Sequence, residues 1–112
     1  MKRINARFYQ SESGNVPVRD WLKELGKPDS TLIGGDIMTV EFGWPIGMPT
    51  CRPLGQGLYE VRTNLPGGRI ARVIFCINEN SMILLHGFIK KTQKTPQAEL
   101  ELANDRKRKL EK

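Results

Sequence analysis

Four side chains in the second half of the chain are of types that could act on a phosphate ester: Arg62, Arg72, His86 and Lys90. Arginine and lysine bind phosphate groups and stabilise the additional negative charge of a phosphorane-like transition state. Cleavage of RNA without a metal ion needs little more, because the 2′-hydroxyl of the substrate is itself the nucleophile. These residues therefore indicate phosphate chemistry, provided that the fold brings them together.

Most other hydrolase mechanisms find no support in the residue pattern. The sequence has no carboxylate pair at useful spacing, no metal motif, no Walker loop and no serine or cysteine triad pattern. We therefore expect no metal and no cofactor. His86 is the only histidine. A lone histidine between apolar neighbours is more often a hydrogen-bonded core residue than a catalyst, so both interpretations of His86 stay open.

The distribution of charge singles out the same part of the chain. The formal net charge is +6, and residues 1–51 contribute nothing to it because their six basic and six acidic side chains balance. Residues 52–94 carry seven basic side chains against Glu60 and Glu79, a net charge of +5. Positive charge concentrated in this way favours a polyanionic partner, most simply a nucleic acid, and solubility alone is the other explanation.

Three predicted antiparallel strands must position the candidate residues. Residues 58–64 (LYEVRTN), 69–77 (RIARVIFCI) and 82–89 (MILLHGFI) are rich in β-branched, aromatic and long apolar side chains, and turn residues separate them. Alternation in the second strand places Arg72 on the face opposite to a wholly apolar one, which must meet the helices. That apolar face consists of Ala71, Val73, Phe75 and Ile77.

The register of the first hairpin decides whether the arginines meet. If Asn64 pairs with Gly68, Arg62 lies diagonal to Arg72 on one face, whereas pairing of Asn64 with Arg69 makes the two arginines diverge. An ion pair of Glu60 with either arginine is the structural alternative to a functional role. We predict that Arg62, Arg72 and Lys90 meet in one groove.

The first part of the chain is predicted to form a strand and a helical hairpin. Residues 2–9 alternate as a short strand whose buried face would hold Ile4, Ala6 and Phe8. One helix begins at Pro17 and stops at Gly26, with an apolar stripe that includes Trp21. A second helix begins at Pro28 and is weakened by two adjacent glycines. Its stripe comprises Leu32, Ile33, Ile37 and Val40.

The remaining elements are a long connection and a last helix. Residues 42–57 are rich in glycine and proline, with a possible short edge strand at residues 51–54. Thr95 and Pro96 favour a helix start. We expect Ala98, Leu102 and Leu110 to face the body and residues 106–109 to be solvated.

Length and composition predict a single domain spanning residues 1–112. No apolar run approaches the roughly 20 residues of a membrane span, and the first ten residues lack the apolar centre of a secretory signal. We therefore expect a cytoplasmic protein without membrane contact. Cys51 and Cys76 have no zinc-ligand partners at useful spacing and are interpreted as small buried hydrophobic residues.

Several motifs together resemble a known family. The predicted order of elements, with GLYEVR leading into a hairpin, RVIF in its second strand and LLHGFIKKTQKTP ending the third, resembles the phage-derived HigB-like toxins of the RelE/ParE superfamily. The resemblance covers most of the chain and is strongest over residues 57–103. It implies an α+β, RelE-like (microbial RNase-like) fold of order β-α-α-β-β-β-α. The antiparallel sheet would pack on an N-terminal helical hairpin and a C-terminal helix.

The resemblance also implies an activity and partners. Toxins of this kind belong to type II toxin–antitoxin systems and cleave messenger RNA in the ribosomal A site, leaving a 2′,3′-cyclic phosphate and a 5′-hydroxyl. A cognate antitoxin with a helix-turn-helix domain holds them inactive, and contact with DNA would be only indirect, through that complex. A non-catalytic basic module that pairs with an antitoxin or a nucleic acid is the alternative.

Residue roles carry over by position. Arg72 matches the sheet arginine that holds the scissile phosphate, and Arg62 matches the basic position of the preceding strand. Lys90 matches the place of a residue for proton transfer or leaving-group stabilisation, whereas His86 does not align with the terminal catalytic histidine of some relatives. The expected RNA contacts are Arg52, Arg69, Lys91 and Lys94.

Overall fold

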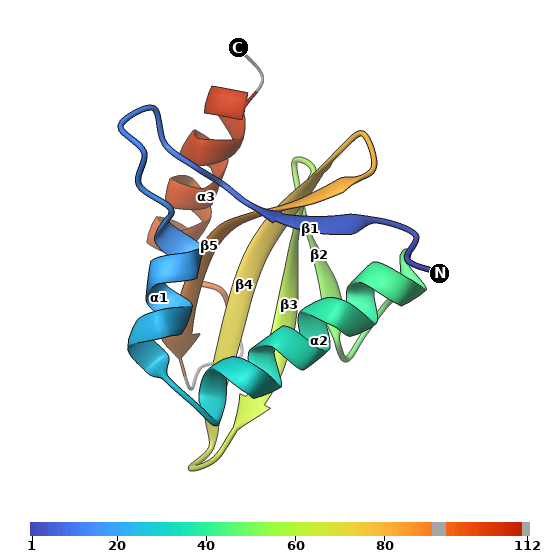
Figure 1. Cartoon of the computed structure of the whole chain (residues 1–112), viewed down its shortest axis with the longest axis vertical. Coiled ribbons are helices and arrows are strands. Elements are labelled where there is room, and N and C mark those ends of the chain that lie inside the picture. The colour runs from blue at the N-terminus through green and yellow to red at the C-terminus, as the bar shows by residue number, and fades with distance from the viewer. Residues whose placement is uncertain (91–93, 111–112) are drawn as a thin grey trace.

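The computed structural model describes residues 1–90 and 94–110, which form an α+β fold with a five-stranded sheet and three helices (Figure 1). The elements in chain order are β1 (Asn5–Phe8), α1 (Pro17–Leu25), α2 (Asp29–Gly43), β2 (Cys51–Gly55), β3 (Leu58–Leu65), β4 (Arg69–Asn78), β5 (Ser81–Lys90) and α3 (Gln97–Leu110). The possible edge strand at residues 51–54 is therefore real, and it adds a fourth strand to the three consecutive strands predicted.

The sheet is mixed, so the expectation of an antiparallel sheet is wrong at one edge. Its order is β1-β5-β4-β3-β2, and β1 runs parallel to β5 while the other neighbours are antiparallel. The buried Glu41, near the end of α2, anchors β1: its Oε2 accepts hydrogen bonds from the Ala6 amide at 2.7 Å and from Lys2 Nζ at 3.2 Å. A parallel edge strand leaves no mark in local residue patterns.

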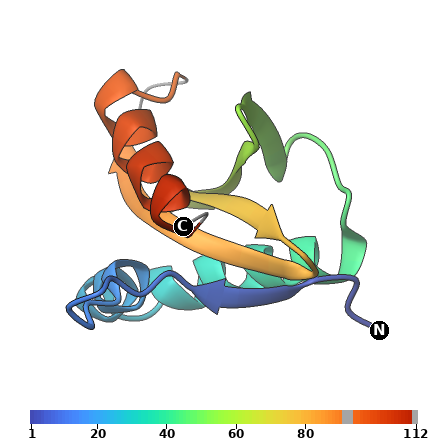
Figure 2. The same ribbon diagram turned by 90° about the horizontal axis from the view of Figure 1, so that it is seen from above.

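The helices divide between the two faces of the sheet. Figure 2 shows α1 and α2 on one side of the curved sheet, and α3 on the other side together with the upturned β2–β3 hairpin. The prediction for β4 is confirmed, because Ala71, Val73 and Phe75 are buried in the core against α1 and α2 and Ile77 packs against it. The opposite side of the sheet, termed here the α3 face, holds a second core that includes Ile74 and Ala103.

The helix boundaries match the sequence signals well, but some side chains that were expected to face the core are exposed. Helix α1 begins at Pro17 and ends before Gly26, and α2 runs unbroken through both of its glycines. Phe8 and Leu32 were expected to be buried and are more than 40% exposed. Within the described residues, no helix has the length and apolar character needed to cross a membrane.

Helix α3 turns a different side to the sheet than predicted. Leu100, Ala103 and Leu110 pack into the second core, whereas Ala98 and Leu102 are exposed. Arg106 is not solvated either, because its Nη1 donates a hydrogen bond of 2.8 Å to the carbonyl of Leu85. A bulge opposite Ile74 and Phe75 leaves Leu85 without a partner in β4, which explains why that carbonyl recruits a side chain.

Gly87 sits where the predicted core tryptophan meets the sheet. A Cβ atom at Gly87 would lie 2.4 Å from ring atoms of Trp21, which packs over β5 from α1. Glycine therefore allows a bulky indole to lie directly on the strand backbone.

We predict opposite effects for two glycine substitutions. Gly87→Ala should destabilise the protein by about 1–3 kcal/mol, because the added methyl group overpacks against Trp21. Gly35→Ala should stabilise it by about 1 kcal/mol, because its Cβ meets open space on a helix. Urea unfolding of both variants measures the difference, and equal midpoints would contradict this account.

The two cysteines should be inert in the native protein. Burial, followed by the negative charge of Glu60, raises the pKa of Cys51 from an ordinary 9.0 to about 11, and Cys76 is buried too. Only the thiolate reacts with a thiol reagent, so neither cysteine should be labelled at pH 8 until denaturant is added. Rapid native labelling would contradict this, and Cys51→Ala identifies the reacting thiol. The stability gained by burying the neutral thiol should be lost as the pH rises from 9.0 towards about 11.

Candidate functional site

The first hairpin brings the two candidate arginines directly opposite each other. Arg62 of β3 pairs with Arg72 of β4, and Asn64 pairs with Ile70. Neither register considered from the sequence is correct. Asn64 was expected to pair with Gly68 or Arg69, which precede its observed partner, Ile70, by two residues and one residue. The observed register places both guanidinium groups on the α3 face, where like charges on facing residues repel each other.

A buried carboxylate lies between the two arginines. Glu60 is completely buried, and its Oε1 lies 3.6 Å from Arg72 Nε and 4.0 Å from Arg62 Nε. Both ion pairs considered from the sequence are therefore present at once, through a single oxygen. At an effective dielectric constant of about 20, opposite unit charges 4 Å apart attract by about 4 kcal/mol, which is enough to offset much of the repulsion between the arginines.

Arg72 is the deepest cation of the group. None of its side chain is exposed, and its Nη1 donates a hydrogen bond to the backbone carbonyl of Lys94 at 3.4 Å. Burial lowers the pKa of the guanidinium; the charge of Glu60 raises it, and Arg62 and Arg52 lower it further. Direct contact between Arg72 and a phosphate would require the segment at Lys94 to move.

Thr95 ties the beginning of α3 to the cluster formed by Glu60, Arg62 and Arg72. Its hydroxyl donates a hydrogen bond of 2.5 Å to Glu60 Oε2, so the two carboxylate oxygens have different roles. Oε1 faces the arginines and Oε2 holds the chain that leads into α3. The sequence suggested Thr95 as a helix cap, and α3 begins two residues later, at Gln97.

Arg62 lies beside a hollow that solvent can enter. The hollow has a volume of about 390 Å³ and is termed here the Arg62 hollow. The side chain of Arg62 is 16% exposed, in contrast to the enclosed Arg72. The residues that line the hollow are Asp36, Pro49, Thr50, Arg62, Asn64 and Ile70.

Lys90 and His86 occupy different rows of the α3 face. Lys90 is exposed and pairs with Ile70, a residue of the Arg62 hollow, whereas His86 pairs with Ile74. Four residues of strand separate them by roughly 13 Å. His86 Nε2 lies 3.0 Å from Glu99 Oε1 of α3, and its ring stacks on Phe88. The contact with Glu99 fits the interpretation of His86 as a hydrogen-bonded residue. A chemical role for His86 stays a prediction.

The predicted RNA contacts are spread over several elements. Arg52 pairs with Glu60 across β2 and β3, on the same face as the cluster. Arg69 is engaged elsewhere: its guanidinium contacts both oxygens of Asp29, at 2.9 and 3.3 Å, and fastens the hairpin to α2. Lys94 is exposed, and Lys91 lies outside the described residues. Their contacts with RNA stay predictions.

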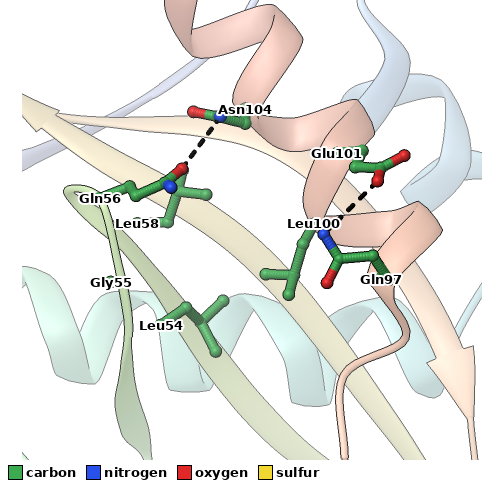
Figure 3. A pocket seen from close by; sticks show the side chains of 8 residues that line it. All are labelled: Leu54, Gly55, Gln56, Leu58, Gln97, Leu100, Glu101 and Asn104. Carbon is green, nitrogen blue, oxygen red and sulfur yellow. Dashed lines mark hydrogen bonds between the residues drawn. The ribbon is translucent and has the colours of Figure 1, made fainter.

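A second hollow, between α3 and the β2–β3 turn, has a different character. Figure 3 shows Leu54 and Leu58 of the β2–β3 hairpin and Leu100 of α3 in its lining, together with the hydrogen bond from Asn104 to Gln56, which measures 3.1 Å. Its volume is about 230 Å³, and none of its lining residues is basic. A polyanion therefore has no electrostatic reason to enter it, which leaves the Arg62 hollow as the better candidate of the two.

Sequence reasoning missed the carboxylate of the Arg62 hollow. Asp36 counted only in the charge balance of residues 1–51, since nothing near it in the sequence marks it as functional. It comes from α2, which contacts β3. Only the tertiary packing of α2 beside β3 brings Asp36 into the lining of the same hollow as Arg62.

Comparison with known proteins identifies a family. Residues 20–108, which include every element from α2 to β5, match the model of the family described as Phage derived protein Gp49-like (DUF891). A search of curated proteins gives no significant match. The matched region contains all the residues of the cluster.

We predict that the cluster contributes strongly to stability. Glu60→Gln should cost about 3–5 kcal/mol, because it leaves Arg72 buried without its counter-ion. Thr95→Val should cost about 2 kcal/mol, since only one hydrogen bond to a charged group is lost. Glu99→Gln, a control at the more exposed contact between Glu99 and His86, should cost less than about 1 kcal/mol. Urea unfolding would contradict the account if Glu60→Gln were as stable as Glu99→Gln.

Proposed function

Because the chain belongs to the Gp49-like family of phage-derived proteins, which is associated with the RelE/HigB-type toxin superfamily, we propose that it is the toxin of a type II toxin–antitoxin pair. The proposed activity is metal-independent cleavage of messenger RNA in the ribosomal A site. A RelE-like topology and a HigB-like relationship are parts of the same proposal. The observation that carries it is the position of Arg62, on a basic sheet face and at the wall of an open hollow.

The proposed reaction uses the substrate as its own nucleophile. The 2′-oxygen attacks the adjacent phosphorus while its proton leaves to a base, and a 2′-O–P bond forms. The P–O5′ bond breaks, and the departing 5′-oxygen takes up a proton. The products are a 2′,3′-cyclic phosphate and a 5′-hydroxyl, and the extra negative charge on phosphorus is the feature that cations must stabilise.

The geometry supports distinct roles for the basic residues. Arg62 is the accessible guanidinium and would bind the scissile phosphate, while Arg72 adds positive potential from behind. Lys90 is the better candidate for stabilising the leaving group, because it pairs with a residue of the Arg62 hollow. His86 lies further along β5 and already has Glu99 as a partner.

The proposed partners follow from the family. A cognate antitoxin with a helix-turn-helix domain would hold the toxin inactive, and the ribosome would present the messenger in the cytoplasm. Contact with DNA would come only through the antitoxin. The net charge of +6 suits binding to the ribosome and its messenger RNA, which are polyanions.

One observation favours a second candidate function. Arg72 is fully buried and both arginines lie near the Glu60 carboxylate, so part of the cationic charge is neutralised. A protein that binds an antitoxin or RNA without cleaving it would tolerate that arrangement. Cleavage assays separate the two candidates.

We predict that Arg62→Gln abolishes toxicity while the fold survives. Removing one positively charged donor at a transition state lowers rates by on the order of 100-fold or more. Wild type and variant would be induced in bacteria, and messenger 5′ ends would be mapped. New 5′ ends should appear for the wild type and fall to background for Arg62→Gln.

Arg19→Gln is the matched control. Arg19 is an exposed arginine of α1, so its loss should leave both growth arrest and 5′ ends unchanged. An equal number of cuts for wild type and Arg62→Gln would contradict the assigned role of Arg62. Absence of new 5′ ends for the wild type would overturn the enzymatic proposal in favour of the binding module.

A further inference from the structure

We propose that the Arg62 hollow is a nucleobase site in which the carboxylate of Asp36 selects guanine. The inference rests on the proposed function, because it takes single-stranded RNA as the ligand. It adds the determinant of sequence preference, which phosphate contacts alone do not supply.

The lining of the hollow has the parts that a base site needs. Arg62 supplies a cation for the backbone phosphate of the nucleotide. Pro49 and Ile70 offer apolar surface to the flat face of a base, and Thr50 and Asn64 add hydrogen-bonding groups. Single-stranded RNA is commonly read in this way, by packing against the base face and hydrogen bonding to its edge.

The carboxylate of Asp36 is unusual in this setting. Among the residues that the structure describes, Asp36 has neither a hydrogen bond nor an ion pair, although it lines the same hollow as an arginine. A carboxylate repels the phosphates of a polyanion. In the same hollow as an arginine that would bind phosphate, it would favour nucleotide binding if it accepts hydrogen bonds from N–H groups of the ligand.

Guanine is the base that fits a carboxylate best. Its Watson–Crick edge carries two adjacent donors, N1–H and the N2 amino group, which match two carboxylate oxygens. Adenine and cytosine each place a ring acceptor beside their amino group, and uracil has one donor between two carbonyl oxygens. These three bases would therefore bring an acceptor against the negative charge of Asp36, which is unfavourable.

The chemistry predicts how the preference changes on substitution. In Asp36→Asn the side chain offers one acceptor and one donor, the pattern that pairs with adenine. Guanine offers the same combination through N1–H and O6, so the variant should lose the guanine preference and bind adenine about as well. A purely structural role for Asp36 would weaken the binding of both bases alike and would leave the preference in place.

Binding of short RNAs tests the proposal without cleavage. The probes are fluorescent pentanucleotides UUGUU and UUAUU, 2′-O-methylated throughout so that no 2′-hydroxyl can attack. Wild type should bind the guanine probe about tenfold or more tightly than the adenine probe, and Asp36→Asn should reduce this ratio to about one. Asp36→Ala should bind both probes alike, and Asp20→Asn, an exposed acidic residue on α1, should behave as wild type.

Mapping of messenger 5′ ends in cells separates this inference from the proposed activity. Guanine at a fixed position beside the cut in wild type, with that preference lost in Asp36→Asn, would support both. Cleavage by wild type with the same base preference as Asp36→Asn would overturn the base site and leave the activity standing. If wild type does not cleave but Asp36→Asn loses the guanine preference that wild type shows for the probes, the activity fails and the base site stands. Equal binding of both probes by wild type overturns the inference.

Discussion

The organisation of this protein depends on a buried carboxylate between two facing arginines. Arg62 and Arg72 occupy directly opposed positions on β3 and β4, an arrangement that would be repulsive alone. Glu60 lies within 4.0 Å of both guanidinium groups and is fully enclosed, so its charge acts with little screening. Removal of the Glu60 charge leaves the two arginines facing each other without a counter-ion.

The same carboxylate connects the sheet to the end of the chain. Through Thr95 it fixes the segment that precedes α3, and α3 then packs Ala103 on the α3 face. At its far end, Arg106 binds the carbonyl that the bulge in β5 exposes. The two faces of the sheet thus have separate tasks: one is an apolar core under α1 and α2, and the other combines packing with a set of cations.

Local patterns predicted much of the fold, because the relevant forces act between near neighbours in the sequence. The alternation around Arg72 identified its face, and Pro17 and Gly26 marked the ends of α1. The hairpin register was beyond such reasoning. It depends on a turn of Pro66, Gly67 and Gly68 in which both glycines adopt positive φ, and several loop lengths suit those residues equally well.

The candidate site was predictable only in part, for a related reason. Arg62, Arg72 and Glu60 lie on neighbouring strands, so alternation could suggest that they share a face. Asp36 lies on α2, far from Arg62 in sequence, and no periodicity connects the two. The burial of Arg72 also has no local signal, because the segment at Lys94 and Thr95 that covers it folds back from beyond β5.

A double-mutant cycle between Glu60 and Arg72 tests the central claim most directly. The free energies of unfolding of wild type, Glu60→Gln, Arg72→Met and the double variant would be measured in urea. The account predicts that the double variant is more stable than the sum of the single effects implies, by about 2 kcal/mol or more, because the second substitution removes a charge that the first left unpaired. Additivity within about 0.5 kcal/mol would show that the two charges do not depend on each other and would contradict the account.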